Sequence, residues 1–140
     1  MQVILFRHGK AVSKDVAGSD EARWLTEEGK RDVERVAKCL PKPTKIYSSP
    51  LRRAKETAEI LSKVFGVEYE VLEELAPGKL NLETFSKIAK PGALYVGHNP
   101  DLEELLRSLG CIAELKASGA AVVSLAPAKL LALLNPQFCP

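Results

Sequence analysis

The stretch VILFRHG, residues 3–9, decides the fold of this 140-residue chain. Four consecutive apolar residues that run into charged residues and a glycine are typical of a strand covered on both faces, whose end opens into a loop. A second continuous apolar run occurs at Ala93–Val96 and a shorter one at Lys45–Ser48, and polar residues follow each of them as well. We therefore expect three buried strands whose carboxyl ends lead into polar loops.

Helical periodicity lies between these runs. Apolar residues at helical spacing, between capping residues and proline or glycine stops, predict three helices: 26–40, Pro50–Phe65 and Pro100–Leu109. Ser49 and Asn99 are the expected N-caps of the second and third helices. Strands that alternate with helices predict an α/β fold, a three-layer α/β/α sandwich with a largely parallel central sheet. The tail adds two strand candidates, Ala121–Leu125 and Lys129–Leu134.

Composition limits the classes of function. The length and a hydrophobic content of 46% suit one domain over residues 1–140. Twenty basic against eighteen acidic residues give a net charge of only +2, which argues against nucleic acid or a membrane as partner. The first apolar run is too short for a signal peptide, so we expect a cytoplasmic protein. Cys39, Cys111 and Cys139 form no CxxC pair, which suggests neither a disulfide framework nor a zinc site.

Three polar segments fall at the same predicted sheet edge, where α/β proteins collect ligands. They are RHG after the first strand, SSPLRRA after the second and VGHNP after the third. Within the second helix, the period of 3.6 places Arg52 on the solvated face with Glu56 and turns Arg53 inward. An inward arginine in the first turn of a helix either pairs with a buried carboxylate or binds an anion, and the partial positive charge of the helix start favours the anion. Five other basic residues are expected to be solvated surface charges: Lys10, Lys14, Arg23, Lys79 and Lys116.

Both histidines of the chain, His8 and His98, lie at predicted strand ends beside a glycine. A single histidine at such a position is more often structural than functional, but the placement of both histidines of the chain at strand ends indicates a functional site. Gly9 lets the backbone approach a ligand closely. No third ligand stands at metal spacing, so we expect no metal and no cofactor.

The segments FRHGK, SSPLRRAKETAEIL and LYVGHNP resemble the histidine phosphatase superfamily, with its phosphoglycerate-mutase-like fold. LTEEG at 25–29 and EELAPG at 73–78 are similar to the SixA-type phosphohistidine phosphatases, and the resemblance runs from Gln2 to about Leu125. It implies that His8 accepts the phosphoryl group and passes it to water, with phosphate as product. It also implies that Arg7 and Arg53 grip the phosphate oxygens and that His98 is the second pocket histidine. Gly9 and Asn99 complete the expected substrate-binding set, although Asn99 can equally act only as a cap.

The leaving group decides between substrates. Glu73 and Glu74 are the candidate general acids, and in a strand-like VLEEL segment they would point to opposite faces. The SixA-type pattern does without this acid. An imidazole, with a pKa of about 6.5, leaves as a neutral ring if its other nitrogen carries a proton, whereas an alkoxide needs a proton donor. We therefore expect a phosphohistidine on a signalling or phosphotransfer protein as substrate.

Two alternatives stay open. The first is a phosphatase or mutase for small phosphate esters, although the short segment Gly78–Ala93 leaves little for a lid. The second is a phosphate-binding module without turnover, against which the complete set of two arginines and two histidines argues. The physiological substrate, the oligomeric state and the roles of the cysteines do not follow from the sequence.

Overall fold

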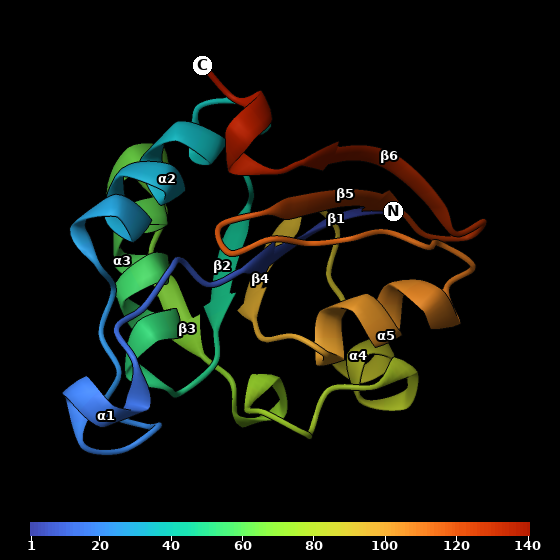
Figure 1. The fold of residues 1–140 in the computed structure, drawn as a ribbon. Coiled ribbons are helices and arrows are strands. Elements are labelled where there is room, and N and C mark those ends of the chain that lie inside the picture. Colours follow the sequence, from blue (N-terminus) through green and yellow to red (C-terminus); the bar gives the residue numbers. More distant parts are fainter.

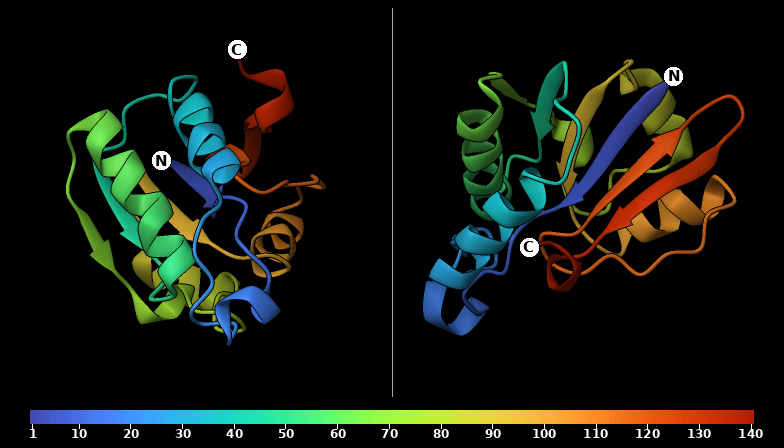
Figure 2. Two further views of the ribbon diagram at one scale, coloured as in Figure 1. Left: turned by 60° about the vertical axis from the view of Figure 1, so that its left-hand side comes forward. Right: turned by 90° about the horizontal axis from the view of Figure 1, so that it is seen from above.

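Six strands form one sheet in the order β3-β2-β4-β1-β5-β6 in the computed structural model, which describes residues 1–140 (Figure 1). Their bounds are β1 Gln2–Arg7, β2 Lys45–Ser48, β3 Tyr69–Val71, β4 Ala93–Gly97, β5 Ala120–Ser124 and β6 Lys129–Leu134. The right-hand view of Figure 2 shows β1 between β4 and β5. Strands β1 to β4 pair in parallel, as expected, but β5 runs antiparallel to β1 and to β6.

The sheet is therefore mixed rather than largely parallel. After its last helix the chain returns to the carboxyl end of β1, where Gly119 accepts a hydrogen bond from the Arg7 amide at 2.9 Å. Strand β5 starts at that edge and must run back along β1, and a short turn joins it to β6 in a hairpin. The reversal places the segment before Gly119 against the end of β1.

Helices cover both faces of the sheet (Figure 1). Their bounds are α1 Lys14–Ala17, α2 Glu27–Ala37, α3 Arg52–Phe65, α4 Leu82–Ile88 and α5 Asp101–Ser108, with 3₁₀ turns at Glu73–Leu75 and Pro136–Phe138. Ile4 and Phe6 of β1 belong to the core under α2 and α3, whereas Val3 and Leu5 belong to the core under α4 and α5. This alternation along one strand produces the continuous apolar run at the start of the sequence.

The predicted elements differ from the observed ones mainly where strands pass into helices. Thr26 caps α2 as expected, since its side chain accepts a hydrogen bond from the Gly29 amide at 2.9 Å. Helix α3 begins at Arg52 rather than Pro50, because Leu51 keeps an extended backbone and makes no side-chain cap. Helix α5 begins one residue later than predicted. None of the helices has the length and apolar character that crossing a membrane requires.

The parallel register aligns the strand ends. Arg7 pairs with Gly97, and Ser48 with Val96, so the residues that follow β1, β2 and β4 are neighbours at one edge. Backbone hydrogen bonds extend this alignment one residue further, from the His8 amide to Gly97 at 3.2 Å and from the Ser49 amide to Val96 at 3.0 Å. Three loops distant in sequence thus start side by side.

Candidate active site

The structure brings the four predicted residues together at this edge. Arg7 ends β1 and His8 follows it, His98 follows β4, and Arg53 lies in the first turn of α3. The Arg53 Nε–H group donates a hydrogen bond to His8 Nε2 at 3.3 Å, and the two histidine rings lie 5.0 Å apart. His8, Arg53 and His98 are all buried. Arg52 instead points outward and donates to the Glu56 carboxylate at 2.8 Å, so the expected inward direction of Arg53 is confirmed.

His8 is held as a neutral ring with a defined tautomer. Its Nδ1 lies 2.8 Å from the Gly9 carbonyl oxygen, which can only accept, so the ring proton is on Nδ1 and Nε2 carries a lone pair. Burial is the main cause that lowers the pKa of His8 to about 3; the Gly9 hydrogen bond opposes this shift, and the charges of the neighbouring His98, Arg53 and Arg7 add to it. Nε2 is thus unprotonated at neutral pH, and its lone pair becomes available for attack once the Arg53 Nε–H group turns from it to a phosphoryl oxygen.

His98 presents its other ring nitrogen to the site. Its Nε2 lies 2.7 Å from the Ser49 hydroxyl, while its Nδ1 is buried without a hydrogen-bond partner. Burial, followed by the charge of Arg53, lowers the pKa of His98 to about 4. Ser49, expected as a helix cap, accepts from the Leu51 amide at 3.3 Å but also contacts His98, which lies 49 residues further along the chain.

A network behind the site holds Arg7. Its Nη1 donates to the Leu115 carbonyl oxygen at 2.9 Å, and its Nε is buried without a partner. The Asn99 amide donates to the same carbonyl and to Glu103, and its oxygen accepts from the Glu103 backbone amide. Glu103 in turn accepts from the Leu115 amide at 2.8 Å. The polar atoms of Asn99 are thus used within the protein, but the expected cap position is wrong by one residue, because the N-cap of α5 is Pro100.

Gly9 makes its close approach to helix α2. A Cβ atom at this position would lie 3.0 Å from the Val33 side chain and 3.1 Å from the Gly29 carbonyl oxygen. The Gly9 amide donates to Thr57 Oγ1 at 3.0 Å, and the Thr57 hydroxyl donates to the Arg53 carbonyl oxygen at 2.9 Å. The glycine therefore ties the loop after β1 to α2 and α3, which positions His8 beside Arg53.

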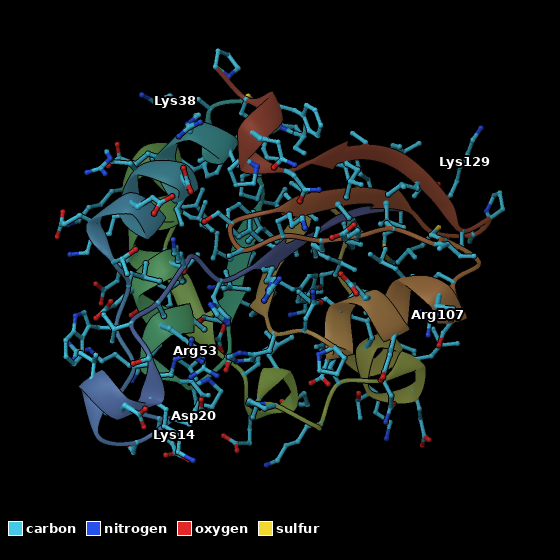
Figure 3. All side chains as sticks on the ribbon, viewed as in Figure 1. Lys14, Asp20, Lys38, Arg53, Arg107 and Lys129 are labelled. Atoms are coloured by element: carbon cyan, nitrogen blue, oxygen red, sulfur yellow. The ribbon has the colours of Figure 1, made fainter.

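Asp20, which no sequence pattern marks, lies beside Arg53 (Figure 3). Its Oδ2 accepts from Arg53 Nη2 at 3.3 Å, its backbone oxygen accepts from Arg53 Nη1 at 2.8 Å, and its Oδ1 accepts from Arg23 at 3.4 Å. Burial opposes ionisation of Asp20, yet the charges and hydrogen bonds of Arg53 and Arg23 hold its pKa below the ordinary value. No periodicity marks a loop residue of this kind.

The two candidate acids lie in a 3₁₀ turn, so the expectation of a strand with opposite-facing carboxylates is wrong. Glu73 is exposed and accepts from Lys79 at 2.8 Å, and Glu74 is exposed as well. Four of the five basic loop residues form ion pairs with nearby carboxylates: Lys10, Arg23, Lys79 and Lys116. No three side chains of His, Cys, Asp or Glu come together in a way that could hold a metal ion.

The chain is similar to known proteins both in sequence and in overall structure. The family model described as histidine phosphatase superfamily, branch 1, matches residues 3–104. An uncharacterized protein of Picosynechococcus is 36% identical over 115 residues, which cover 74% of this chain and 70% of that protein. The mitochondrial serine/threonine-protein phosphatase Pgam5 of Drosophila sechellia is 38% identical over 72 residues, which cover 49% of this chain but only 24% of that protein.

Two solved structures are similar over almost their whole length. The protein histidine phosphatase SixA, complexed with tungstate, matches with a TM-score of 0.85 and 25% identity, covering 98% of both chains. A SixA protein from Agrobacterium tumefaciens matches with a TM-score of 0.83 and 24% identity, covering 96% of this chain and 98% of the other.

Proposed function

The chain belongs to the histidine phosphatase superfamily, and from that membership we propose that it removes the phosphoryl group from phosphohistidine on a signalling or phosphotransfer protein. In this proposal His8 is the nucleophile and becomes transiently phosphorylated. The membership makes the protein a phosphatase that acts on phosphorylated substrates. The choice of phosphohistidine and the roles of single residues are the proposal.

The observation that carries the proposal is the set of buried polar atoms without a partner. Among side-chain nitrogen and oxygen atoms there are three: Arg7 Nε, His98 Nδ1 and Ser118 Oγ. Two belong to the proposed site, and Ser118 adjoins it, since its amide donates to the carbonyl oxygens of Arg7 and His8 at 3.1 Å. A buried polar group left unpaired costs about 1–3 kcal/mol, so their gathering at one place indicates a ligand that supplies acceptors.

The first step transfers the phosphoryl group to His8. The Nε2 lone pair attacks phosphorus, the bond from phosphorus to the substrate nitrogen breaks, and its electron pair stays on the departing imidazole. Nδ1–H keeps its hydrogen bond to the Gly9 carbonyl throughout, so the ring needs no proton transfer. Arg7 and Arg53 supply positive charge to the equatorial oxygens, where charge accumulates in the transition state.

The position of the His98 ring proton determines the roles of Ser49 and His98. When the Ser49 hydroxyl donates to Nε2, the His98 proton lies on Nδ1 and forms a donor aimed at a phosphoryl oxygen. In the second step water attacks phosphorus and passes one of its protons to a phosphoryl oxygen. The electron pair of the broken bond returns to His8 Nε2, and phosphate leaves as H₂PO₄⁻, which carries both protons of the water.

The surface positions of Glu73 and Glu74 support a nitrogen leaving group, because an alkoxide would need a buried proton donor near phosphorus. Rates on a phosphohistidine peptide should be compared with those on a phosphoserine peptide and a panel of sugar and glycerate phosphates. We expect kcat/KM to be highest on the phosphohistidine peptide and unchanged in a Glu73→Gln, Glu74→Gln double variant. Faster turnover of any ester, lost in the double variant, would establish the ester phosphatase instead.

A further inference from the structure

Asp20 is the one carboxylate hydrogen-bonded to either of the proposed phosphate-binding arginines. It shares one edge of the Arg53 guanidinium with the nucleophile: Nε donates to His8 Nε2 and Nη2 donates to Asp20 Oδ2, both at 3.3 Å. Such an edge is the fork with which arginine grips two oxygens of a phosphoryl group. A negative charge at this place works against phosphate, so its presence calls for a compensating role.

The exposure of these side chains gives the direction of the site. His8 is 8% exposed and Arg53 5% exposed, whereas the Asp20 side chain is 44% exposed. We infer that a substrate approaches from the side of Asp20, the exposed member of this group. Phosphoryl transfer runs roughly in line, with the nucleophile and the leaving group on opposite sides of phosphorus. With His8 on the buried side, the leaving group departs toward Asp20.

Asp20 is also held from its other side. Arg23 donates to Oδ1 at 3.4 Å, so the carboxylate keeps an anchor when Arg53 Nη2 turns to a phosphoryl oxygen. In that exchange Oδ2 loses its donor while it faces the leaving group. A carboxylate oxygen in this situation needs a new hydrogen-bond donor.

We propose that Asp20 recognises the leaving group, by accepting a hydrogen bond from the ring N–H group of the substrate's phosphohistidine that is distant from phosphorus. The inference rests on the function proposed above and assigns the preference for phosphohistidine to this residue. A carboxylate beside the leaving group attracts a protonated phosphoimidazole and repels a departing alkoxide or phenolate. It therefore favours phosphohistidine substrates and disfavours phosphate esters.

The atoms balance around this contact. In the protonated substrate, phosphorus is bonded to one ring nitrogen and the other carries the proton that Asp20 holds. When the bond to phosphorus breaks, the electron pair remains on the first nitrogen, and the second keeps its proton. The ring departs as neutral imidazole, and no proton passes to or from Asp20. The Gly9 carbonyl holds the Nδ1 proton of His8 in the equivalent manner on the nucleophile.

The test compares phosphoimidazole, which has the same leaving group without a protein, with p-nitrophenyl phosphate. Asp20→Asn keeps the shape and one acceptor oxygen but removes the charge. We expect kcat/KM on phosphoimidazole to fall about tenfold, as for the loss of a charge-assisted hydrogen bond. On p-nitrophenyl phosphate it should stay constant or rise, because the departing phenolate no longer meets a negative charge. Asp15→Asn, at an exposed position of α1, is the matched control and should change neither rate.

The ratio of the two kcat/KM values is the readout, because a carboxylate that only positions Arg53 would affect both substrates equally. An unchanged ratio in Asp20→Asn, and in the smaller Asp20→Ser, overturns the inference while the wild-type rate on phosphoimidazole preserves the proposed function. A wild-type enzyme that hydrolyses p-nitrophenyl phosphate but not phosphoimidazole overturns the proposed function as well.

Discussion

Moderate acid should destabilise this protein through its two histidines. In the folded state burial lowers the pKa of His8 to about 3 and that of His98 to about 4. In the unfolded chain both return to about 6.5. Between these pKa values the histidines bind protons in the unfolded state but not in the folded state. The free energy of unfolding is therefore highest above pH 7 and decreases as the pH falls.

The size of the loss follows from the same pKa values. Between pH 7 and pH 5 each histidine should remove about 2 kcal/mol from the free energy of unfolding, or about 4 kcal/mol for the pair. Because a domain of this size is stable by about 5–15 kcal/mol, the effect is large. The chain has only these two histidines, so no other imidazole contributes to it.

Urea denaturation at pH 7, 6 and 5 measures the effect, and a His98→Gln variant should lose about half of the slope. Lys14→Gln, at an exposed position, is the control and should leave the slope unchanged. A free energy of unfolding that stays constant from pH 7 to pH 5 would refute the reasoning. It would mean that burial does not lower the pKa of the two histidines and that they bind protons in the folded state as readily as in the unfolded chain.

Three further results are expected from steady-state kinetics. Arg53→Ala should lower kcat/KM about 100-fold, or about 3 kcal/mol, because it removes a hydrogen-bond donor to the transition state. The neighbouring Arg52→Ala should change kcat/KM less than twofold, and equal losses in the two variants would contradict the inward direction of Arg53. Ser49→Ala should lower kcat about five- to tenfold through loss of the hydroxyl that sets the His98 proton, and an unchanged kcat would remove that role. Glu103→Gln should raise KM more than it lowers kcat, because it weakens the network that holds Arg7 through Leu115; a loss confined to kcat would argue against this network.

The central strands could be predicted because strands covered on both faces need apolar residues at every position. That need makes β1, β2 and β4 visible as continuous runs. The direction of Arg53 was predictable for a similar reason, since burial follows the helical period. Strand β3 has three residues that are largely exposed, so no comparable run marks it.

The meeting of the strand ends was predictable, but other contacts between distant segments were not. The direction of β5 depends on where the chain returns after α5, and an apolar run is the same in either direction. Ser49 fits the pattern of a cap, yet its hydroxyl contacts His98 on another loop. Asp20 lies 33 residues before Arg53, and only the path of the intervening chain brings the two together.

The central claim is that His8 Nε2 carries the phosphoryl group during turnover, and trapping that intermediate tests it most directly. Enzyme mixed with excess phosphoimidazole, quenched in alkali and mapped by mass spectrometry and ³¹P NMR should carry one phosphoryl group on Nε2 of His8. The His8→Gln variant should carry none and release no phosphate. Phosphate released at the full rate with no label on His8, or with the label on another residue, would contradict the account.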